Sequence, residues 1–474
     1  MVHAVSGAGI DLLTIDRGTV TAPAGCGKTH LIAESLKRHL QPKPILILTH
    51  TNAGVAALRG RLDKASVPAK SYRLSTIDGW VMRLVGLFPV RSGVAPDVLS
   101  NSETDYPAFQ KAARTLLKGG HVNDVLAATY DRLIVDEYQD CTIPQHAIVY
   151  YAAQSLPSCI LGDPMQAIFG WQGNEAADWH DQVCKHFPIR GQLADPWRWT
   201  NAGTDGFGRW LLQIRAKLET DKSFDIREAP PQVTWIELDG QNDHPRQLRA
   251  GSTPAPESGG TVMVIASSTP QVQRNFASQI PGAVTVEAVN LTDLVTFART
   301  LDFTHSLALD HVVDFAAKVM TKVGPNDLIR RVDALTRGSA RNAASTIEKV
   351  ALAFQANPCP RMAVELLVAI NQQSEVREYR PAVLRSCIRA LNSCDGSEGN
   401  TFHDAAIRAR EQNRLIGRPL AKRVVGSTLL LKGLEADVAV ILNAADHDAK
   451  NLYVAMTRGA KRLVICSKSP VLNA

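Results

Sequence analysis

The stretch Val20-Thr21-Ala22-Pro23-Ala24-Gly25-Cys26-Gly27-Lys28-Thr29 decides the fold of this chain. An apolar strand runs into a Gly-rich turn, and the segment His30–Leu40 predicts a helix directly after it. Backbone N–H groups of such a turn form a nest at a helix N-terminus, which binds phosphate. An ordinary Gly-rich turn is the alternative, but the order strand, turn, Lys-Thr and helix argues against it. The residues predicted to bind a nucleotide are Ala24, Gly25, Cys26, Gly27, Lys28 and Thr29, with Lys28 on the β- and γ-phosphates and Thr29 on Mg²⁺.

Composition bounds the class of protein. The chain has 474 residues, 45% of them hydrophobic and 21% charged, which is typical of a globular protein rather than a disordered or fibrous one. That length predicts two to four compact units, because single cores rarely exceed about 250–300 residues. A net charge of +6 permits a nucleic-acid partner without requiring one. Eight cysteines without metal-ligand spacing predict reduced thiols, and with no leader or long apolar run we expect a cytoplasmic protein without a membrane partner.

Polar residues follow a second predicted strand, Ile45–Leu48. His50, Thr51 and Asn52 come next, before a periodic helix, and Thr76 opens another helix in the same way. Ligands of parallel sheets collect at the carboxyl ends of strands, so these residues are candidates for binding. A helix N-cap is the alternative role for the same residue types.

Acidic residues end a third predicted strand, which lies in Arg132–Asp140. Downstream of a phosphate-binding loop, the Asp at such a strand end holds Mg²⁺ and the following Glu polarises the attacking water. We therefore assign Asp136 to the metal and Glu137 to the water. Plain loop solvation is the alternative interpretation of such a pair.

A fourth predicted strand, Cys159–Leu161, leads into Gly162-Asp163-Pro164-Met165-Gln166. The Gln166 amide is a candidate sensor of the γ-phosphate. Phe169 and Trp171 follow on a loop bounded by glycines, and they are candidates for stacking on bases, with core packing as the alternative.

In this order, the motifs resemble those of UvrD/Rep-type superfamily 1 helicases. The resemblance implies an α/β fold of two RecA-like lobes, ATP and Mg²⁺ as cofactors, and DNA contacts for the residues at the strand ends. The matching segments of the first half are Ala24–Thr29, Leu48–Asn52, Asp136–Asp140 and Gly162–Gln166 with Gly170-Trp171.

The second half of the chain continues the resemblance. Pro196–Trp199 is similar to a motif that places Trp197 on adenine and Arg198 on the γ-phosphate, and Lys432–Asp437 to one whose Glu435 touches the sugar. Tyr453–Arg458 is similar to a motif whose Arg458 is a second arginine at the phosphates. Strands expected at Val233–Leu238, Thr261–Ser267 and Arg462–Ser467 predict a second sheet.

The resemblance predicts domain boundaries. Residues 1–195 form the first lobe with a small, less regular insertion at about 86–128, and residues 196–289 with 424–474 form the second lobe. Residues 290–423 are a helical insertion whose basic positions form either a solvated face or a surface for a duplex or a partner. Helices are expected in it at Leu291–Phe303, Ala308–Val323, Ala340–Phe354 and Met362–Gln373.

The implied function is a DNA-dependent ATPase that moves 3′ to 5′ on single-stranded DNA, or on a duplex with a single-stranded end, and unwinds it. Departures from the family pattern support an alternative. Gln41 is the first glutamine, so the upstream adenine-reading Gln is absent, and His50 and Asp78 replace an aromatic residue and a His. Length and layout are similar to the helicase-like subunit of Gabija-type anti-phage systems, which acts beside a nuclease. The alternative is therefore a DNA-sensing ATPase that regulates a nuclease partner.

Overall fold

The computed structural model describes residues 9–95, 98, 105–170, 175–288, 290–397, 399–415 and 421–473. The chain divides into two compact units, Met1–Leu238 with Asp437–Ala474, and Asp239–Ala436. The domain boundaries expected from the sequence stay a prediction. Among the described residues, no helix is both long enough and apolar enough to cross a bilayer.

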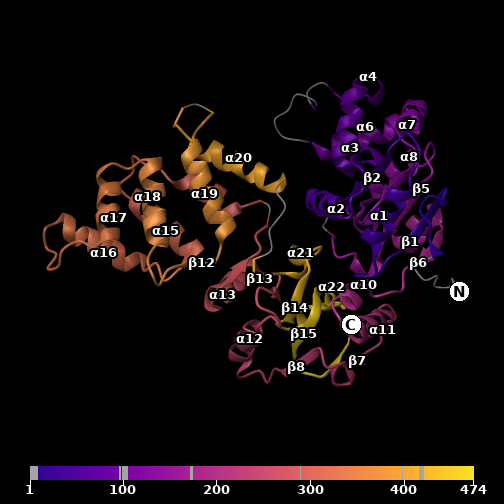
Figure 1. Cartoon of the computed structure of the whole chain (residues 1–474). Coiled ribbons are helices and arrows are strands. Elements are labelled where there is room, and N and C mark those ends of the chain that lie inside the picture. The colour runs from indigo at the N-terminus through magenta and orange to yellow at the C-terminus, as the bar shows by residue number, and fades with distance from the viewer. Residues whose placement is uncertain are drawn as a thin grey trace. The chain divides into compact units, whose positions relative to one another are not determined.

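A six-stranded parallel sheet forms the centre of the first unit (Figure 1). Its continuous apolar strands are buried on both faces, as parallel strands between helices are. Ile45 and Ile47 enter one hydrophobic cluster, whereas Leu46 and Leu48 enter the other. In sheet order, the strands are β3 (Tyr72–Thr76), β2 (Ile45–Thr49), β4 (Leu133–Val135), β5 (Ser158–Gly162), β1 (Arg17–Thr21) and β6 (Ile189–Gln192).

Helices connect these strands. The stretch expected to be less regular, 86–128, contains the helix α6, because Phe109, Ala112 and Leu116 recur at helical spacing and pack into the core. Asp105 caps this helix by accepting a hydrogen bond from the Ala108 N–H at 3.0 Å. The helices of this unit are α1 (Lys28–Arg38), α2 (Asn52–Lys64), α3 (Ile77–Leu87), α4 (Pro89–Ser92), α6 (Tyr106–Lys118), α7 (Asn123–Thr129), α8 (Ile143–Ala152), α9 (Cys184–His186), α10 (Trp197–Asn201), α11 (Asp205–Leu218) and α22 (Ala449–Met456).

A second six-stranded sheet completes the α/β fold. Its strands, in order, are β10 (Ala283–Thr285), β13 (Arg423–Gly426), β9 (Val262–Ile265), β14 (Ala436–Ile441), β15 (Gly459–Ser467) and β8 (Val233–Glu237). The pairs β10–β13, β13–β9 and β15–β8 are parallel. Two parallel sheets flanked by helices confirm the predicted fold of two RecA-like lobes. Two short antiparallel pairs are β11 (Met320–Thr321) with β12 (Arg377–Glu378), and β7 (Phe224–Asp225) with β16 (Val471–Leu472).

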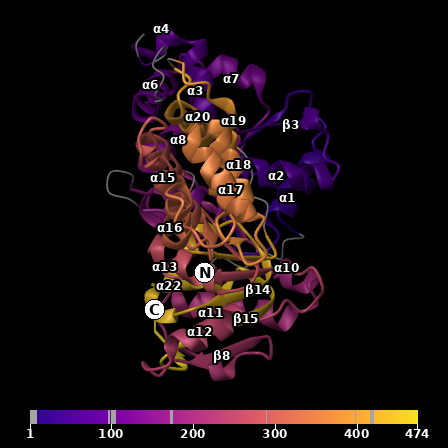
Figure 2. The same ribbon diagram turned by 90° about the vertical axis from the view of Figure 1, so that its left-hand side faces the viewer.

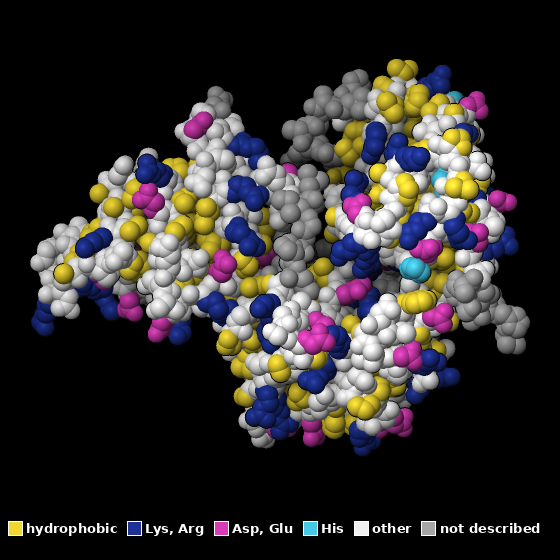
Figure 3. Space-filling view, in the orientation of Figure 1, with side chains coloured by type: hydrophobic (Ala, Val, Ile, Leu, Met, Phe, Trp, Pro, Cys, Tyr) yellow, Lys and Arg dark blue, Asp and Glu magenta, His cyan; other side chains and the backbone are white. Residues whose placement is uncertain are grey.

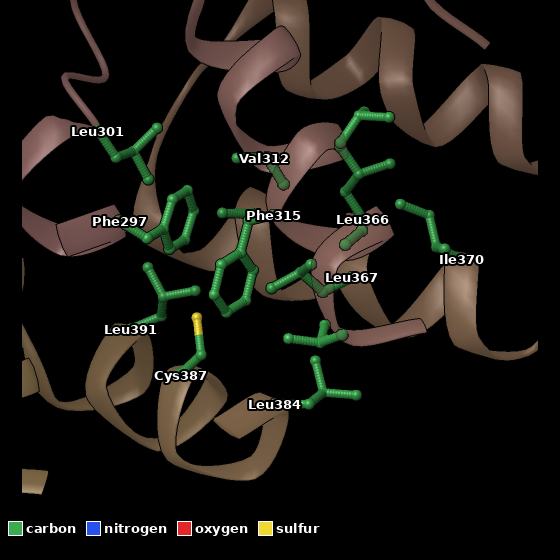
Figure 4. Packing of buried hydrophobic residues seen from close by; sticks show 14 of the residues in the cluster. Phe297, Leu301, Val312, Phe315, Leu366, Leu367, Ile370, Leu384, Cys387 and Leu391 are labelled. Carbon is green, nitrogen blue, oxygen red and sulfur yellow. The ribbon is translucent and has the colours of Figure 1, made fainter. Parts of the chain in front are cut away.

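Helices dominate the second unit. The segment after β10 packs around one hydrophobic cluster, in which the Phe297 and Phe315 rings stack with centroids 4.1 Å apart (Figure 4). Helices α15, α17 and α18 lie side by side (Figure 2). The helices of this unit are α12 (Asp243–Gly251), α13 (Pro270–Gln279), α14 (Thr292–Thr300), α15 (Ala308–Val319), α16 (Pro325–Thr336), α17 (Thr346–Ala356), α18 (Pro360–Asn371), α19 (Pro381–Ser393), α20 (Phe402–Leu415) and α21 (Thr428–Leu431).

One predicted helix start in this unit is wrong. The helix expected from Ala340 begins at Thr346, because Ser345 forms a capping box with Glu348 and so fixes the start. Several basic side chains form exposed ion pairs, such as Arg330 with Asp327 at 2.5 Å. Figure 3 shows basic side chains over the surface of this helical part, with acidic side chains among them. The solvated face and the binding surface both stay predictions for the basic positions of this segment.

Candidate nucleotide site

The candidate site lies at the carboxyl edge of the first sheet. The phosphate-binding loop follows β1, Asp136 follows β4, and Asp163 follows β5. Because β4, β5 and β1 are neighbours in the sheet, their three following segments come together there. Ligands of parallel sheets bind at this edge.

The loop adopts the conformation that a phosphate nest requires. Gly25 and Gly27 have φ of 70° and 85°, in the left-handed region that favours glycine. A Cβ atom at Gly27 would lie 2.7 Å from Cδ1 of Trp197, and one at Gly25 would lie 2.5 Å from a ring atom of Trp199. Burial raises the pKa of the Cys26 thiol to about 12, so it stays protonated.

Lys28 lies between two carboxylates. Its Nζ is 2.6 Å from Oε1 of Glu137 and 3.1 Å from Oδ1 of Asp136. Burial opposes the ammonium charge, but the two carboxylates outweigh it, and the pKa of Lys28 is raised. Burial also raises the pKa of Asp136, against the effect of Lys28. The carboxylate pair therefore already holds a cation, which fits a site that takes Mg²⁺.

Glu137 has a backbone conformation that is rare for its residue type. Its φ is 56° and its ψ is 40°, and a non-glycine residue in this region is held there at a cost of about 1–3 kcal/mol. Its N–H donates to Oδ1 of Asp136 at 3.0 Å, and Oε2 accepts from Nε2 of Gln139 at 2.6 Å. These contacts fix the carboxylate that we assign to the attacking water.

Thr29 contacts an arginine from the next helix. Its hydroxyl oxygen accepts a hydrogen bond from Nη1 of Arg61, on α2, at 3.1 Å. This contact could not be predicted from the sequence, because Arg61 has the appearance of an ordinary exposed helix residue. A cation therefore faces the hydroxyl that is predicted to bind Mg²⁺.

Gln166 is buried and held by Asp163. Its Nε2 donates to Oδ2 of Asp163 at 3.1 Å, and Oδ1 of the same carboxylate accepts from Nη2 of Arg215 at 2.7 Å. The Asp163 N–H donates to Oε1 of Gln139 at 3.1 Å. The predicted phosphate sensor thus belongs to a buried polar network with Gln139 and Arg215, two residues that sequence reasoning missed.

Trp197 and Arg198 lie against the phosphate-binding loop. The Arg198 N–H donates to the Gly25 carbonyl at 3.0 Å, and the ring of Trp197 is 5.8 Å from that of His30, centroid to centroid. Trp197 is 44% exposed, so its indole is accessible for stacking. Nη1 of Arg198 donates to the Thr457 carbonyl at 2.5 Å.

Arg458 is buried, and its guanidinium turns back onto its own helix. Nε donates to the Val454 carbonyl at 2.8 Å, and Nη2 donates to the Thr457 hydroxyl at 3.0 Å. The same helix, α22, carries Tyr453, whose phenolic oxygen accepts from the Ala24 N–H at 3.1 Å. This segment therefore lies against the loop, although Arg458 is engaged by carbonyl and hydroxyl groups of its own motif.

The described residues among those predicted to contact DNA lie at the same sheet edge. Thr51 caps the N-terminus of α2 and Thr76 that of α3, each by accepting a hydrogen bond from a glycine N–H at 3.0 Å. Both residues therefore have the helix-capping role that the sequence offered as the alternative to binding. His50 and Phe169 lie together, with centroids 5.8 Å apart, and Asn52 is exposed at the start of α2. Trp171 lies outside the described residues.

Glu435 belongs to the second unit. It is exposed in the turn between α21 and β14. The sugar contact predicted for Glu435 stays a prediction. The described residues contain no group of three or more His, Cys, Asp or Glu side chains arranged to hold a metal ion. The assignment of Thr29 and Asp136 to Mg²⁺ stays a prediction.

The fold and the loop define a helicase-like P-loop protein. Residues 101–181 match the family model of the UvrD/REP helicase N-terminal domain. The chain is also 24% identical over 200 residues to Gabija protein GajB of Bacillus cereus (strain VD045), a match that covers 35% of this chain and 40% of that protein. The chain thus spans less than half of this relative's length. These findings confirm the resemblance to UvrD-type helicases.

Two solved helicase structures are among those that resemble the chain. A Pif1 helicase from Candida albicans aligns with a TM-score of 0.32 and 13% identity, covering 56% of this chain and 51% of that one. An Arterivirus nonstructural protein 10 helicase, solved with DNA, aligns with a TM-score of 0.27 and 13% identity, covering 54% and 49%.

Proposed function

We propose that the chain is a DNA-dependent ATPase that translocates 3′ to 5′ on single-stranded DNA and unwinds duplexes with a single-stranded end. One observation carries the ATPase proposal: the Lys28 ammonium lies within 3.1 Å of both the Asp136 and the Glu137 carboxylates, at the end of a glycine nest. The proximity of these three residues supports their assignment as phosphate-binding cation, metal ligand and general base.

Each residue has a distinct role in hydrolysis. The loop N–H groups and Lys28 bind the phosphates, and Glu137 orients the attacking water and takes its proton. Gln166 contacts the γ-phosphate, and Arg198 and Arg458 stabilise its charge in the transition state. Arginines in this role contribute about 10³–10⁵ in rate in related phosphoryl transfers. Trp197 stacks on the base, and Glu435 contacts the sugar.

Thr29 and Asp136 would hold Mg²⁺, which neutralises phosphate charge when bound. Lys28, which contacts the Asp136 and Glu137 carboxylates in this structure, would contact the phosphates. Arg61, which donates to the Thr29 hydroxyl, lies beside the residue that would hold the metal.

We assign the DNA contacts to the residues at the carboxyl edge of the first sheet. His50 and Phe169 form an aromatic pair there, and stacking of bases on aromatic side chains is worth about 1–3 kcal/mol per base. We assign Thr51, Asn52 and Thr76 to contacts with the DNA backbone, and Trp171 to a second stacking position. The net charge of +6 is compatible with a polyanion partner.

A strand-displacement assay with a 3′ single-stranded overhang tests the motor. We expect ATP-dependent unwinding that requires the 3′ overhang and is lost in Phe169→Ala. ATP turnover on DNA with neither unwinding nor translocation, at every protein concentration, would contradict the motor and leave the ATPase.

The match to Gabija protein GajB favours a second candidate, a DNA-sensing ATPase that activates a nuclease partner in anti-phage defence. Under this proposal, DNA stimulates hydrolysis and nucleotide turnover switches the partner. Co-expression with a candidate nuclease tests it. Nuclease activity that depends on Lys28 but not on unwinding would support this role over the motor.

A further inference from the structure

We propose that Arg215 is a positioning residue for hydrolysis, because it holds Asp163. The Asp163 carboxylate orients the side-chain amide of Gln166, and the Asp163 backbone N–H orients that of Gln139, which contacts Glu137. The proposal rests on the ATPase function above and adds a residue that lies outside every motif recognised in the sequence. Arg215 is in the fourth turn of α11 and is buried. A buried side chain that carries a charge requires a partner.

That partner is Asp163. The Asp163 side chain has no exposed surface, and its Oδ1 accepts from both Nε and Nη2 of Arg215, at 3.2 and 2.7 Å. Such a two-donor contact has a fixed geometry that a lysine cannot reproduce. Burial opposes the Arg215 charge, but the Asp163 carboxylate outweighs it, and the pKa of Arg215 is raised.

An ionised Asp163 determines how the Gln166 amide points. A carboxylate only accepts hydrogen bonds, so Gln166 must present its NH₂ group, as the 3.1 Å contact from Nε2 to Oδ2 shows. The Gln166 carbonyl oxygen must then point away from Asp163.

The orientation of Gln139 is set by the backbone N–H of Asp163, and Arg215 holds that residue in place through its side chain. The Asp163 N–H is only a donor, so it must meet Oε1 of Gln139, at 3.1 Å. Nε2 of Gln139 therefore points to Oε2 of Glu137, at 2.6 Å, and to Oδ2 of Asp140, at 3.5 Å. Both acceptors are carboxylates. A flipped Gln139 amide would point its carbonyl oxygen at these carboxylates and its NH₂ group at the Asp163 N–H, and none of these contacts would be a hydrogen bond.

The contacts form one continuous path. It runs from Lys28 through Glu137, Gln139 and Asp163 to Arg215. Arg215 also donates to Glu219 at 2.9 Å, and the Glu219 side chain is 40% exposed, so the path ends at the surface of α11. Tyr453 and Cys26 also face the Asp163 carboxylate, and both keep their protons because burial raises their pKa values. Arg215 is therefore the cation that balances Asp163.

The experiment compares Arg215→Met with Arg215→Lys and with Arg209→Met, a matched control on the exposed side of the same helix. In the nucleotide-free protein, NMR follows the side-chain amides of Gln139 and Gln166, assigned from Gln139→Met and Gln166→Met. ATP turnover gives kcat and KM. In Arg215→Met we expect the protected side-chain amide signals of Gln139 and Gln166 to be lost. We also expect kcat to fall about 10²-fold while KM changes less than about threefold, as when a catalytic group is misplaced. Arg215→Lys should recover part of kcat, and Arg209→Met should match the wild type.

A double variant separates positioning from folding. Asp163→Asn with Arg215→Met removes both buried charges, so no unpaired charge remains to unfold the protein. Because an amide at position 163 both donates and accepts, Gln166 is no longer oriented, and we expect kcat to stay low. Wild-type kcat in the double variant, or unchanged amide signals in Arg215→Met, would overturn the proposal. Amide signals that depend on Arg215 in a chain without ATP turnover would reject the ATPase and retain the positioning role.

Discussion

The phenolic oxygen of Tyr453 accepts a hydrogen bond from the backbone N–H of Ala24, 3.1 Å away and 429 residues distant along the chain. Both groups are buried, and burial holds the pKa of Tyr453 well above its ordinary value, so the phenol stays neutral. The bond joins the phosphate-binding loop to α22, which ends at Met456 and is followed by Thr457 and Arg458. A motif near the C-terminal end of the sequence thereby holds the phosphate-binding loop, which lies near the N-terminal end.

Tyr453→Phe should destabilise the first unit. The substitution removes only the hydroxyl and leaves the Ala24 N–H buried without its partner, which costs about 1–3 kcal/mol. Thermal or urea unfolding of the whole chain measures the change, and exposed Tyr106→Phe is the control. An unchanged midpoint would mean that the bond to Ala24 does not form in solution.

Gly27→Ala should lower nucleotide affinity by more than about tenfold. A Cβ at this position meets Trp197 at 2.7 Å, and φ of 85° is unfavourable for alanine, so the nest must distort. Titration with ADP and Mg²⁺ gives the affinity. Gly60→Ala on α2 is the control, since its Cβ meets nothing within 4 Å and alanine favours the helix by about 1 kcal/mol. Equal affinities for the two variants would contradict a phosphate site at Gly27.

Two tryptophans of one short helix should behave differently. Trp197→Ala should lower nucleotide affinity about tenfold with little change in stability, because its exposed ring is assigned to the base. Trp199→Ala should instead cost about 3–5 kcal/mol of stability, because Trp199 is fully buried and its Nε1 donates to the Gly459 carbonyl at 3.0 Å. Calorimetric titration and unfolding distinguish the two effects. Loss of stability in Trp197→Ala without loss of affinity would reject the stacking role.

Stability should fall in acid because of His146. Burial, together with His186, lowers its pKa from 6.5 to about 4, and its Nδ1 lies 2.7 Å from the Tyr138 hydroxyl. Protonation therefore favours the unfolded chain. The stabilisation is fully present above pH 6.5 and is lost as the pH falls toward 4.

The variant His146→Gln tests this assignment. It retains a hydrogen-bonding group but cannot titrate, so its melting temperature should fall less than that of the wild type between pH 6.5 and 4. The expected difference in unfolding free energy is on the order of 1–2 kcal/mol. Parallel pH profiles for the two proteins would show that His146 does not titrate in this range.

The sequence predicted the parts of the site that lie next to strand ends. Lys28, Asp136 and Gln166 each follow a short apolar run, and parallel strands bring such positions to one edge whatever the connecting segments are. The helix α6 was missed because prolines and a polar run around it suggested irregular chain, whereas its apolar positions repeat at helical spacing. The start of α17 depended on a single capping box at Ser345.

The residues that hold the site in place were harder to predict. Arg215 lies in an amphipathic helix and resembles a surface arginine until its contact with Asp163, 52 residues away, is seen. The bond between Tyr453 and Ala24 likewise depends on tertiary packing alone. Gln139 was part of a recognised motif, but its partners come from two different strand ends. A single sequence carries no local signal for such pairings.

The most direct test of the central claim is steady-state ATP hydrolysis at fixed low salt, with and without single-stranded DNA, for the wild type, Lys28→Ala and Glu137→Gln. Salt must be stated because it controls binding to a polyanion. We expect DNA to stimulate wild-type turnover several-fold and both substitutions to abolish it, with Glu137→Gln still binding ATP. DNA-independent turnover that survives Lys28→Ala, or no turnover with DNA present, would contradict the account.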